Sequence, residues 1–348
     1  MAAERVIPIP SLRPLPGCSA ARVRRGPFRG EPVTSTAETA PVSAAASATV
    51  SATPDLAAVP RIDFLLLALA VSGVAFSAPL ISAIAAPAVA IAFWRNCFAT
   101  GVLAPITLLR HRAELRAMTR RTVLLSLAAG AFLALHFALW LPSLRLTDVA
   151  TSTALCTATP LWTTLYLRLR GHRPPRIVWA GISLAFAGVV LLTGFDLTLS
   201  SRAVLGDVLA LGAGMAASGY FLLGSEVRRT VSTTAYTFVC YATTAVLLLV
   251  TCLLSGQSLT GYSATAWWQI VLLTGCAQFL GHSLSNRVVR TLGPSFVSTA
   301  ILLETPGATL IAAVWLGQLP PLAVYPAVAM IMAGLLLIIR AGRRPAAA

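Results

Sequence analysis

The sequence predicts an all-α integral membrane protein in which ten transmembrane helices form two inverted five-helix repeats. Hydrophobic residues make up 57% of the 348 residues and charged residues only 11%, which leaves too little polar surface to cover a water-soluble globule. Ten apolar stretches are each long enough to cross a hydrocarbon core of about 30 Å. The last five of these stretches repeat the first five in sequence.

Residues 1–58 are rich in Ala, Ser, Thr, Pro and Arg and show no apolar periodicity. Such a composition buries too little apolar surface to offset the entropy lost on ordering, so we expect a disordered cytoplasmic tail, or a start codon assigned too early. The stretch also lacks the apolar core of a secretory signal, and its prolines argue against an amphipathic transit peptide.

The ten apolar stretches follow this tail without a long interruption. They are expected as membrane helices at 62–82, 87–109, 122–142, 147–167, 177–195, 206–225, 233–254, 267–287, 295–316 and 322–340.

The charges between these stretches predict the orientation, because positively charged residues concentrate in cytoplasmic loops. With the first helix entering from the cytoplasm, the inner loops hold most of the Arg residues, including five between residues 110 and 121. The outer turns hold only Arg145 and Arg202, which Asp148, Asp196 and Asp207 offset. Both termini, including a short tail at 341–348, are therefore expected in the cytoplasm. Because all basic residues are Arg and Ala is abundant, as a GC-rich genome tends to encode, the expected location is a bacterial cytoplasmic membrane.

The repeat is gapless over most of its length. Pro160 matches Pro306 (306 − 160 = 146), and many small and polar residues match at the same shift. The two halves span 59–194 and 205–340. Because each half crosses the membrane an odd number of times, the second half must lie inverted relative to the first. Inverted repeats place a binding site near the midplane, between halves that rock to open either side.

Two segments, DVATSTALCTATPLWTTLYLRLRGHRP and PSFVSTAILLETPGATLIAAVWLGQLP, each run from a helix rich in Thr and small residues through a proline to a glycine turn. With the 5+5 arrangement, FWRNCFATGVLAP in the second helix and GDVLALGAGMAASGYFLL in the sixth, they resemble the EamA family of the drug/metabolite transporter superfamily. The resemblance covers the chain after residue 58 and implies a membrane transporter. It does not imply a substrate, because members handle amino acids, other metabolites, sugars and xenobiotics. The family often shows Gly-Glu where this chain has Gly171-His172 and Gly317-Gln318, so a role for that Glu does not carry over.

Two charged residues lie deep within apolar stretches, where a charge is costly unless it faces a cavity or a partner. Arg95 is a candidate contact for an anionic or carboxylate group, and the alternative is a hub of hydrogen bonds that fixes helix packing. Glu304 is expected near the midplane, where it is a candidate for binding a cationic group or a proton. Its alternative is a protonated carboxyl bonded to a neighbouring helix.

Uncharged polar residues extend this candidate site. Gln278, His282 and Asn286 recur at i, i+4 and i+8 on the eighth helix, and His136 with Trp140 occupies the matching place on the third. In lipid such stripes must face protein or water. Ordinary packing of each His is the alternative, and no metal site is expected at this spacing.

The paired prolines Pro160 and Pro306 each remove a backbone donor within a helix, and we expect them to act as hinges beside a cavity. The nearby hydroxyls offer further substrate contacts or, as the alternative, bonds between helices. These hydroxyls belong to Thr153, Thr157, Ser298 and Thr299.

No P-loop, Rossmann fingerprint, GxSxG or HExxH motif occurs, so neither an enzyme activity nor a cofactor is predicted. The sequence predicts a secondary transporter or facilitator that exports an amino acid or related metabolite by alternating access. Drug or cation efflux is the alternative within transport, and a non-transporting receptor or scaffold is the alternative outside it.

The expected partners are a small-molecule substrate and the lipid bilayer, with a proton as the candidate coupling ion. Nucleic acid is not expected despite a net charge of +15, because the Arg residues lie in loops and the tail. A monomer and a homodimer both stay open.

Overall fold

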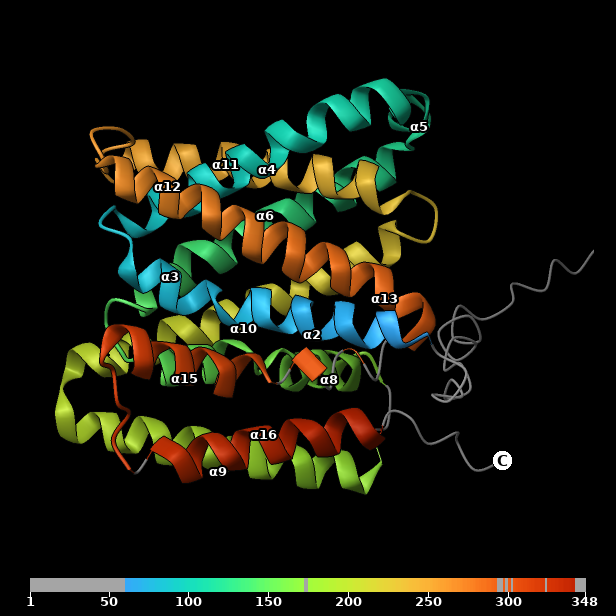
Figure 1. Cartoon of the computed structure of the whole chain (residues 1–348). Coiled ribbons are helices and arrows are strands. Elements are labelled where there is room, and N and C mark those ends of the chain that lie inside the picture. The colour runs from blue at the N-terminus through green and yellow to red at the C-terminus, as the bar shows by residue number, and fades with distance from the viewer. Residues whose placement is uncertain are drawn as a thin grey trace, which may run out of the picture. The chain divides into compact units, whose positions relative to one another are not determined.

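The computed structural model describes residues 60–171, 175–292, 297, 300–301, 303–322 and 324–341, and every regular element in this part is a helix (Figure 1). The expectations for the tails at 1–58 and 341–348 fall almost wholly outside the described residues and stay predictions.

The helices of the first half correspond to the first five apolar stretches. They are α2 (Arg61–Ala75), α3 (Ser77–Ala83), α4 (Ala88–Arg110), α5 (Arg112–Ala117), α6 (Arg120–Ser143), α7 (Val149–Cys156), α8 (Thr159–Leu169) and α9 (Arg176–Leu199). The helices of the second half follow the same order. They are α10 (Ser201–Val227), α11 (Thr233–Leu254), α12 (Ala264–Leu273), the π-helix η1 (Thr274–Ser283), α13 (Leu284–Leu292), α15 (Glu304–Leu316) and α16 (Val324–Ala341).

Five helical spans in the described part are long and apolar enough to cross a membrane, and α9 and α16 contain shorter apolar helices. Many apolar side chains on these helices face outward. Leu109, Leu254 and Val314, for example, are 80%, 85% and 82% exposed. Outward-facing leucine and valine in such number are expected where lipid, rather than water, surrounds the helices.

Short polar side chains begin many of these helices. Asp148 accepts a hydrogen bond from the backbone N–H of Thr151 at 2.9 Å and so caps α7. Ser200, Ser232 and Ser263 cap α10, α11 and α12 in the same way. An N-cap satisfies a backbone donor that the helix leaves unpaired, so these residues fix where the helices start.

Four of the expected membrane helices are not single regular α-helices. The expectation of one helix over 147–167 with a proline in its middle is wrong, because α7 ends at Cys156 and α8 begins at Thr159. Pro160 therefore lies in the first turn of α8, where its missing N–H costs nothing. The stretch at 62–82 is interrupted at Phe76, between α2 and α3. The stretch at 267–287 is continuous, but its middle is the π-helix η1.

The second proline stretch is interrupted in the same way. Leu303 lies in a turn and α15 begins at Glu304, so Pro306 also lies in the first turn of a helix rather than in mid-helix. At the far end, Gly317 ends α15 with φ of 67°, and Gly171 follows α8 with φ of 90°. Only glycine adopts this left-handed conformation without cost, so both glycine turns have the conformation that ends a helix.

The contacts between the halves are two-fold symmetric. Equivalent helices meet each other, α4 with α11 and α9 with α16, and α7 of the first half packs on α15 of the second. The other main contacts come as a pair, since α6 packs on α10 and the matching α2 packs on η1 and α13.

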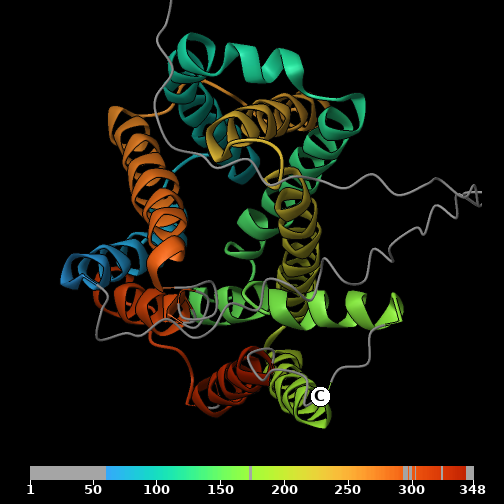
Figure 2. The ribbon, with the colours of Figure 1, turned by 90° about the vertical axis from the view of Figure 1, so that its right-hand side faces the viewer.

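The α9–α16 pair depends on glycine at the crossing (Figure 2). A Cβ on Gly181 would lie 2.7 Å from the carbonyl oxygen of Gly334, and one on Gly334 would lie 2.5 Å from that of Gly181. The two backbones therefore touch, as in small-residue contacts between membrane helices. A separate apolar cluster that includes Val178, Ile331 and Leu335 surrounds this pair.

The loops divide between two ends of the helix bundle. At one end Arg121 of α6 lies 3.4 Å from Glu226 of α10, next to the turn before α11. At the other end Arg145 donates to the carbonyl oxygens of Ile81 and Ile84, and the indole of Trp94 donates to Leu259. Figure 1 shows α5 at the right-hand end and the start of α12 at the left-hand end. The Arg-rich loops around α5 and after α10 thus lie together, opposite the turns that are poor in Arg.

Candidate functional site

Arg95 is the most deeply buried charged side chain of α4, with only 2% of its surface exposed. Its Nη2 donates a hydrogen bond of 2.6 Å to Oε1 of Gln278. Its Nε and Nη1 are also buried, and they make no hydrogen bond with the described residues. A guanidinium has five N–H groups, and these two nitrogens carry three of them. Arg95 therefore holds donors available for a further partner.

Aromatic rings surround this guanidinium. Its central carbon lies 4.7 Å from the ring centre of Phe137 on α6, in cation–π contact. Tyr241 of α11 is buried and close enough to influence the charge of Arg95. Tyr241 stands at the position equivalent to Arg95 in the second half (241 − 95 = 146). The contact between α4 and α11 thus brings two equivalent positions together.

Gln278 comes from the middle of η1 and is 3% exposed. A π-helix is rare and is often found at functional sites, since it changes where the side chains on a helix point. The tight contact of η1 with α2 is possible because residue 73 is glycine. A Cβ on Gly73 would lie 2.8 Å from the carbonyl oxygen of Cys276. The packing of α2 therefore fixes the position of η1, whose Gln278 accepts the hydrogen bond from Arg95.

Glu304 opens α15 and is 8% exposed. The break after Leu303 places its carboxyl in the first helical turn, where unpaired N–H groups and the helix dipole favour a negative charge. Its charge and that of Arg95 act on each other, although no ion pair within 4 Å joins them in the described part. Cys156, at the end of α7, is a further electrostatic neighbour of Glu304.

His136 and Trp140 of α6 lie on one face, as the spacing predicts, with ring centres 5.6 Å apart and nearly parallel. Nδ1 of His136 lies 3.0 Å from the carbonyl oxygen of Ala213 on α10, so Nδ1 carries the proton and Nε2 is left as an acceptor when the ring is neutral. His136 is also close enough to Arg95 for the two side chains to interact electrostatically. Trp140 is buried, and its indole nitrogen makes no hydrogen bond with the described residues.

The hydroxyl residues of α7 divide into two kinds. Thr157 shares a hydrogen bond of 3.3 Å with Thr305, the residue after Glu304, and donates to Ala154. This contact joins the breaks in the two halves. Thr153 is wholly buried with its hydroxyl unpaired among the described residues, so it makes no hydrogen bond to the cluster around Arg95.

Four expected site residues cannot be placed. Ser298 and Thr299 lie outside the described residues, and His282 and Asn286 are described for their backbone only, within η1 and α13. The assignment of these four stays a prediction.

Two polar residues were not predicted from the sequence, Tyr241 beside Arg95 and Thr305 next to Glu304. Tyr241 lies in an apolar helix with nothing to mark it except its equivalence to Arg95 under the 146-residue shift. Thr305 was overlooked between the more prominent Glu304 and Pro306, although it is equivalent to Thr159. The 146-residue repeat is the signal from which both positions could have been found.

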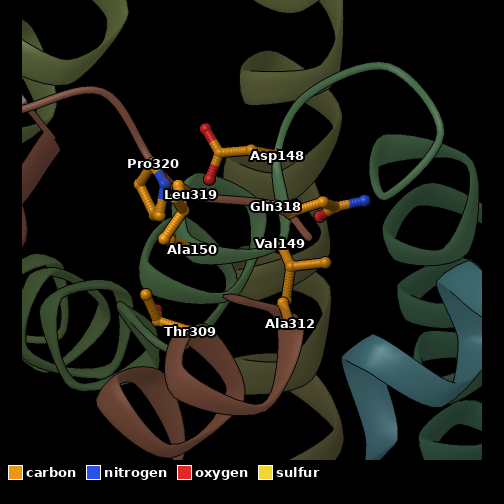
Figure 3. Close-up of a pocket in the computed structure, with 8 residues that line it drawn as sticks. All are labelled: Asp148, Val149, Ala150, Thr309, Ala312, Gln318, Leu319 and Pro320. Atoms are coloured by element: carbon orange, nitrogen blue, oxygen red, sulfur yellow. The ribbon is translucent and has the colours of Figure 1, made fainter. Parts of the chain in front are cut away.

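A small cavity of about 20 Å³ lies at the Arg-poor end, between α7 and the chain that follows α15 (Figure 3). Asp148, Thr309 and Gln318 are the polar residues that line it, and Pro320 also lines it. It has room for about one water molecule. Among the described residues, no group of three or more His, Cys, Asp or Glu side chains is placed to hold a metal ion.

Comparisons with known proteins agree with this architecture. Sixteen chains of solved structures match this one. One of them, described only as the crystal structure of a protein, matches with a TM-score of 0.54 and 20% identity over 79% of this chain and 94% of that chain. At that identity the likeness shows the fold alone. None of the curated proteins compared with the chain matches it.

A family model gives the more specific result. The model described as the EamA-like transporter family matches twice, over residues 61–194 and 204–340, which together make up most of the chain. The two matches correspond to the two halves of the helical bundle. The chain therefore belongs to the EamA-like transporter family, within the drug/metabolite transporter superfamily, and is a multi-pass membrane protein.

Proposed function

We propose that this protein is a secondary transporter or facilitator that exports an amino acid or related small metabolite across a bacterial cytoplasmic membrane. Ten helices in two inverted repeats, with both termini in the cytoplasm, form two bodies that rock about a central site. The substrate reaches this site from one side at a time, and a proton is the candidate coupling ion.

One observation carries this proposal. Arg95 comes from the first half, Gln278 and Glu304 come from the second, and all three side chains are buried. Arg95 and Gln278 lie where α4, α6, η1 and α11 pack together, and Glu304 at the start of α15 is close enough for its charge to act on Arg95. Charged side chains within membrane helices are rare, face the interior of the bundle or a water-filled cavity, and commonly mark a substrate or ion path. A site shared by both halves is also what rocking requires, because relative movement of the halves then alters the site.

Export of cationic drugs is the second candidate. The rings of Phe137 and Tyr241 are buried beside Arg95, and the Glu304 carboxylate also acts on Arg95; aromatic faces and a carboxylate in one region suit an aromatic cation. Arg95 argues against it, since a second positive charge would be repelled there.

Counterflow in proteoliposomes tests the proposal. Vesicles that contain the full chain and an excess of one unlabelled solute should accumulate the same labelled solute, for at least one amino acid of a panel that also includes sugars and cationic dyes. Empty vesicles give the background. If no solute of the panel is exchanged by folded protein, a non-transporting role is the better account. If only cationic dyes are exchanged, drug efflux replaces amino acid export.

A further inference from the structure

We propose that Arg95 and Glu304 together recognise the head group of a zwitterion, with Arg95 binding the carboxylate and Glu304 binding the ammonium group of an α-amino acid. This inference rests on the proposed transport function and names the chemical class that the central site accepts. It treats the two charged residues as one site rather than as two separate contacts.

The first support is the hydrogen-bonding state of Arg95. Gln278 occupies Nη2 and holds the guanidinium in one orientation, while Nε and Nη1 remain without a partner among the described residues. Leaving buried donors unsatisfied is costly, and more so for a charged group. A carboxylate is the acceptor that best matches a guanidinium in charge and geometry. The unused donors therefore point to a carboxylate that binds during transport.

The second support is the separation of the two charges. Arg95 and Glu304 are close enough to interact electrostatically, but no ion pair within 4 Å joins them in the described part. A buried pair that served structure alone would gain most from direct contact, because desolvation of each ion costs several kcal/mol. The two side chains instead stay out of direct contact, and the head group of an α-amino acid carries the complementary opposite charges on one short unit.

The third support is selectivity that follows from charge balance. A zwitterion pairs both buried charges at once and brings no net charge into the membrane. An anion would leave Glu304 unpaired, and a cation would leave Arg95 unpaired, so each should bind at least about 100-fold more weakly.

The two charges also come from different halves, since α4 belongs to the first and α15 to the second. A ligand that bridges them would contact both rocking bodies. Glu304 reaches the site only because α15 starts there, and the Thr157–Thr305 hydrogen bond holds that start against the end of α7.

Binding measurements on the purified full chain test the proposal. The probes are sets of three, each consisting of an L-amino acid, its N-acetyl derivative, which is an anion, and its amide, which is a cation. Thermal unfolding with increasing probe gives the apparent affinity. We expect stabilisation by at least one amino acid and affinities at least about 100-fold lower for both of its derivatives.

Two variants should then each change which of the three probes binds most tightly. Arg95→Gln should lose the need for the carboxylate, so the amide should bind at least as well as the parent amino acid. Glu304→Gln should do the reverse and favour the N-acetyl derivative. Arg145→Gln is the matched control, because Arg145 bonds to the carbonyl oxygens of Ile81 and Ile84 at the Arg-poor end and should keep the zwitterion preference.

The outcomes separate this inference from the function on which it rests. Equal binding of a derivative and its amino acid by the parent would overturn the zwitterion site, and so would a loss of all three probes alike in both folded variants. If either variant does not fold, the affinities of the parent for the three probes decide alone. Counterflow of a sugar or a dye without any amino acid would also overturn it, while leaving transport intact. Absence of all binding and all counterflow would instead overturn the proposed function.

Discussion

At the residue scale, the burial of Arg95 explains why so much of the centre is polar. A guanidinium stays protonated even when it is buried. It therefore needs hydrogen-bond acceptors and aromatic faces in contact with it wherever it lies. Gln278 and Phe137 provide these contacts from two other helices. The cluster is therefore a structural node in which Arg95 keeps unused donors, and the proposed binding role does not exclude the structural one.

The sequence made the charged members of this site predictable, because Arg95 and Glu304 interrupt long apolar stretches. Tyr241 and Phe137 were not predictable in the same way. Aromatic residues are common on membrane helices, and only the contacts of α4 with α6 and α11 show which of them face Arg95. The side-chain environment of a buried charge depends on helix packing, which periodicity alone does not give.

At the Arg-rich end, a different glutamate joins α5 to the start of α11. Glu114 of α5 accepts hydrogen bonds from the backbone N–H and the hydroxyl of Ser232, the N-cap of α11, and it lies 3.0 Å from Nδ1 of His111. Partial burial would raise the pKa of the Glu114 carboxyl, but the hydrogen bonds from Ser232 and His111 outweigh it and hold the pKa below its usual value of 4.5.

Glu114→Gln should therefore destabilise the protein by about 1–2 kcal/mol at neutral pH, measured by thermal unfolding in detergent. Because the folded-state pKa is lowered, this contribution is complete above pH 4.5 and is lost as the pH falls through the folded value. The difference between parent and variant should shrink accordingly in acid. Glu226→Gln is the control, since its pairs with Arg121 and Arg229 are exposed and worth little. An equal effect of both substitutions would contradict this account.

At the element scale, the helix breaks fix the positions of Thr157 and Glu304. The apolar pattern located all the stretches to within a few residues where the structure describes them, because hydrophobicity alone sets the length of a membrane helix. The restart of the helix at Thr159 and at Glu304 was not predicted. A proline is compatible both with a kinked helix and with the first turn of a new one, and the packing of α7 against α15 decides between them.

The contact between α9 and α16 gives a sharp test of helix packing. Gly334→Ala would place a Cβ 2.5 Å from the carbonyl oxygen of Gly181 and 2.6 Å from the backbone N of Ala185. The helices must then separate, which we expect to cost about 1–3 kcal/mol in thermal stability. Gly101→Ala is the control, because nothing lies within 4 Å of its Cβ and alanine favours a helix. Equal stability of the two variants would show that α9 and α16 do not pack this closely.

At the scale of the whole molecule, the Arg-rich loops predict which side faces the cytoplasm. In a cysteine-free background that retains counterflow, Arg116→Cys should be inaccessible to a membrane-impermeant thiol reagent added to intact cells, and accessible in inverted vesicles. Ser258→Cys, in the turn before α12, should behave in the opposite way. Labelling of position 116 from outside would reverse the proposed orientation.

Deletion of the N-terminal stretch tests whether the fold needs it. Deletion of residues 1–55 should leave membrane insertion and counterflow unchanged, because its composition provides no apolar surface to pack on the helices. Loss of folded protein after this deletion would assign the stretch a structural role.

The most direct test of the central claim is access to the site from the two sides of the membrane. Thr157 lies beside Glu304 at the helix break, so Thr157→Cys in the same cysteine-free background reports on the path between the halves. Alternating access predicts that an impermeant thiol reagent labels this cysteine from either side, and that a transported amino acid slows the labelling from both. Gly101→Cys, on an exposed face of α4, should stay unlabelled because lipid covers it. A cysteine at position 157 that reacts from one side only, or from neither, with no effect of any solute, would contradict a central site shared by two rocking halves.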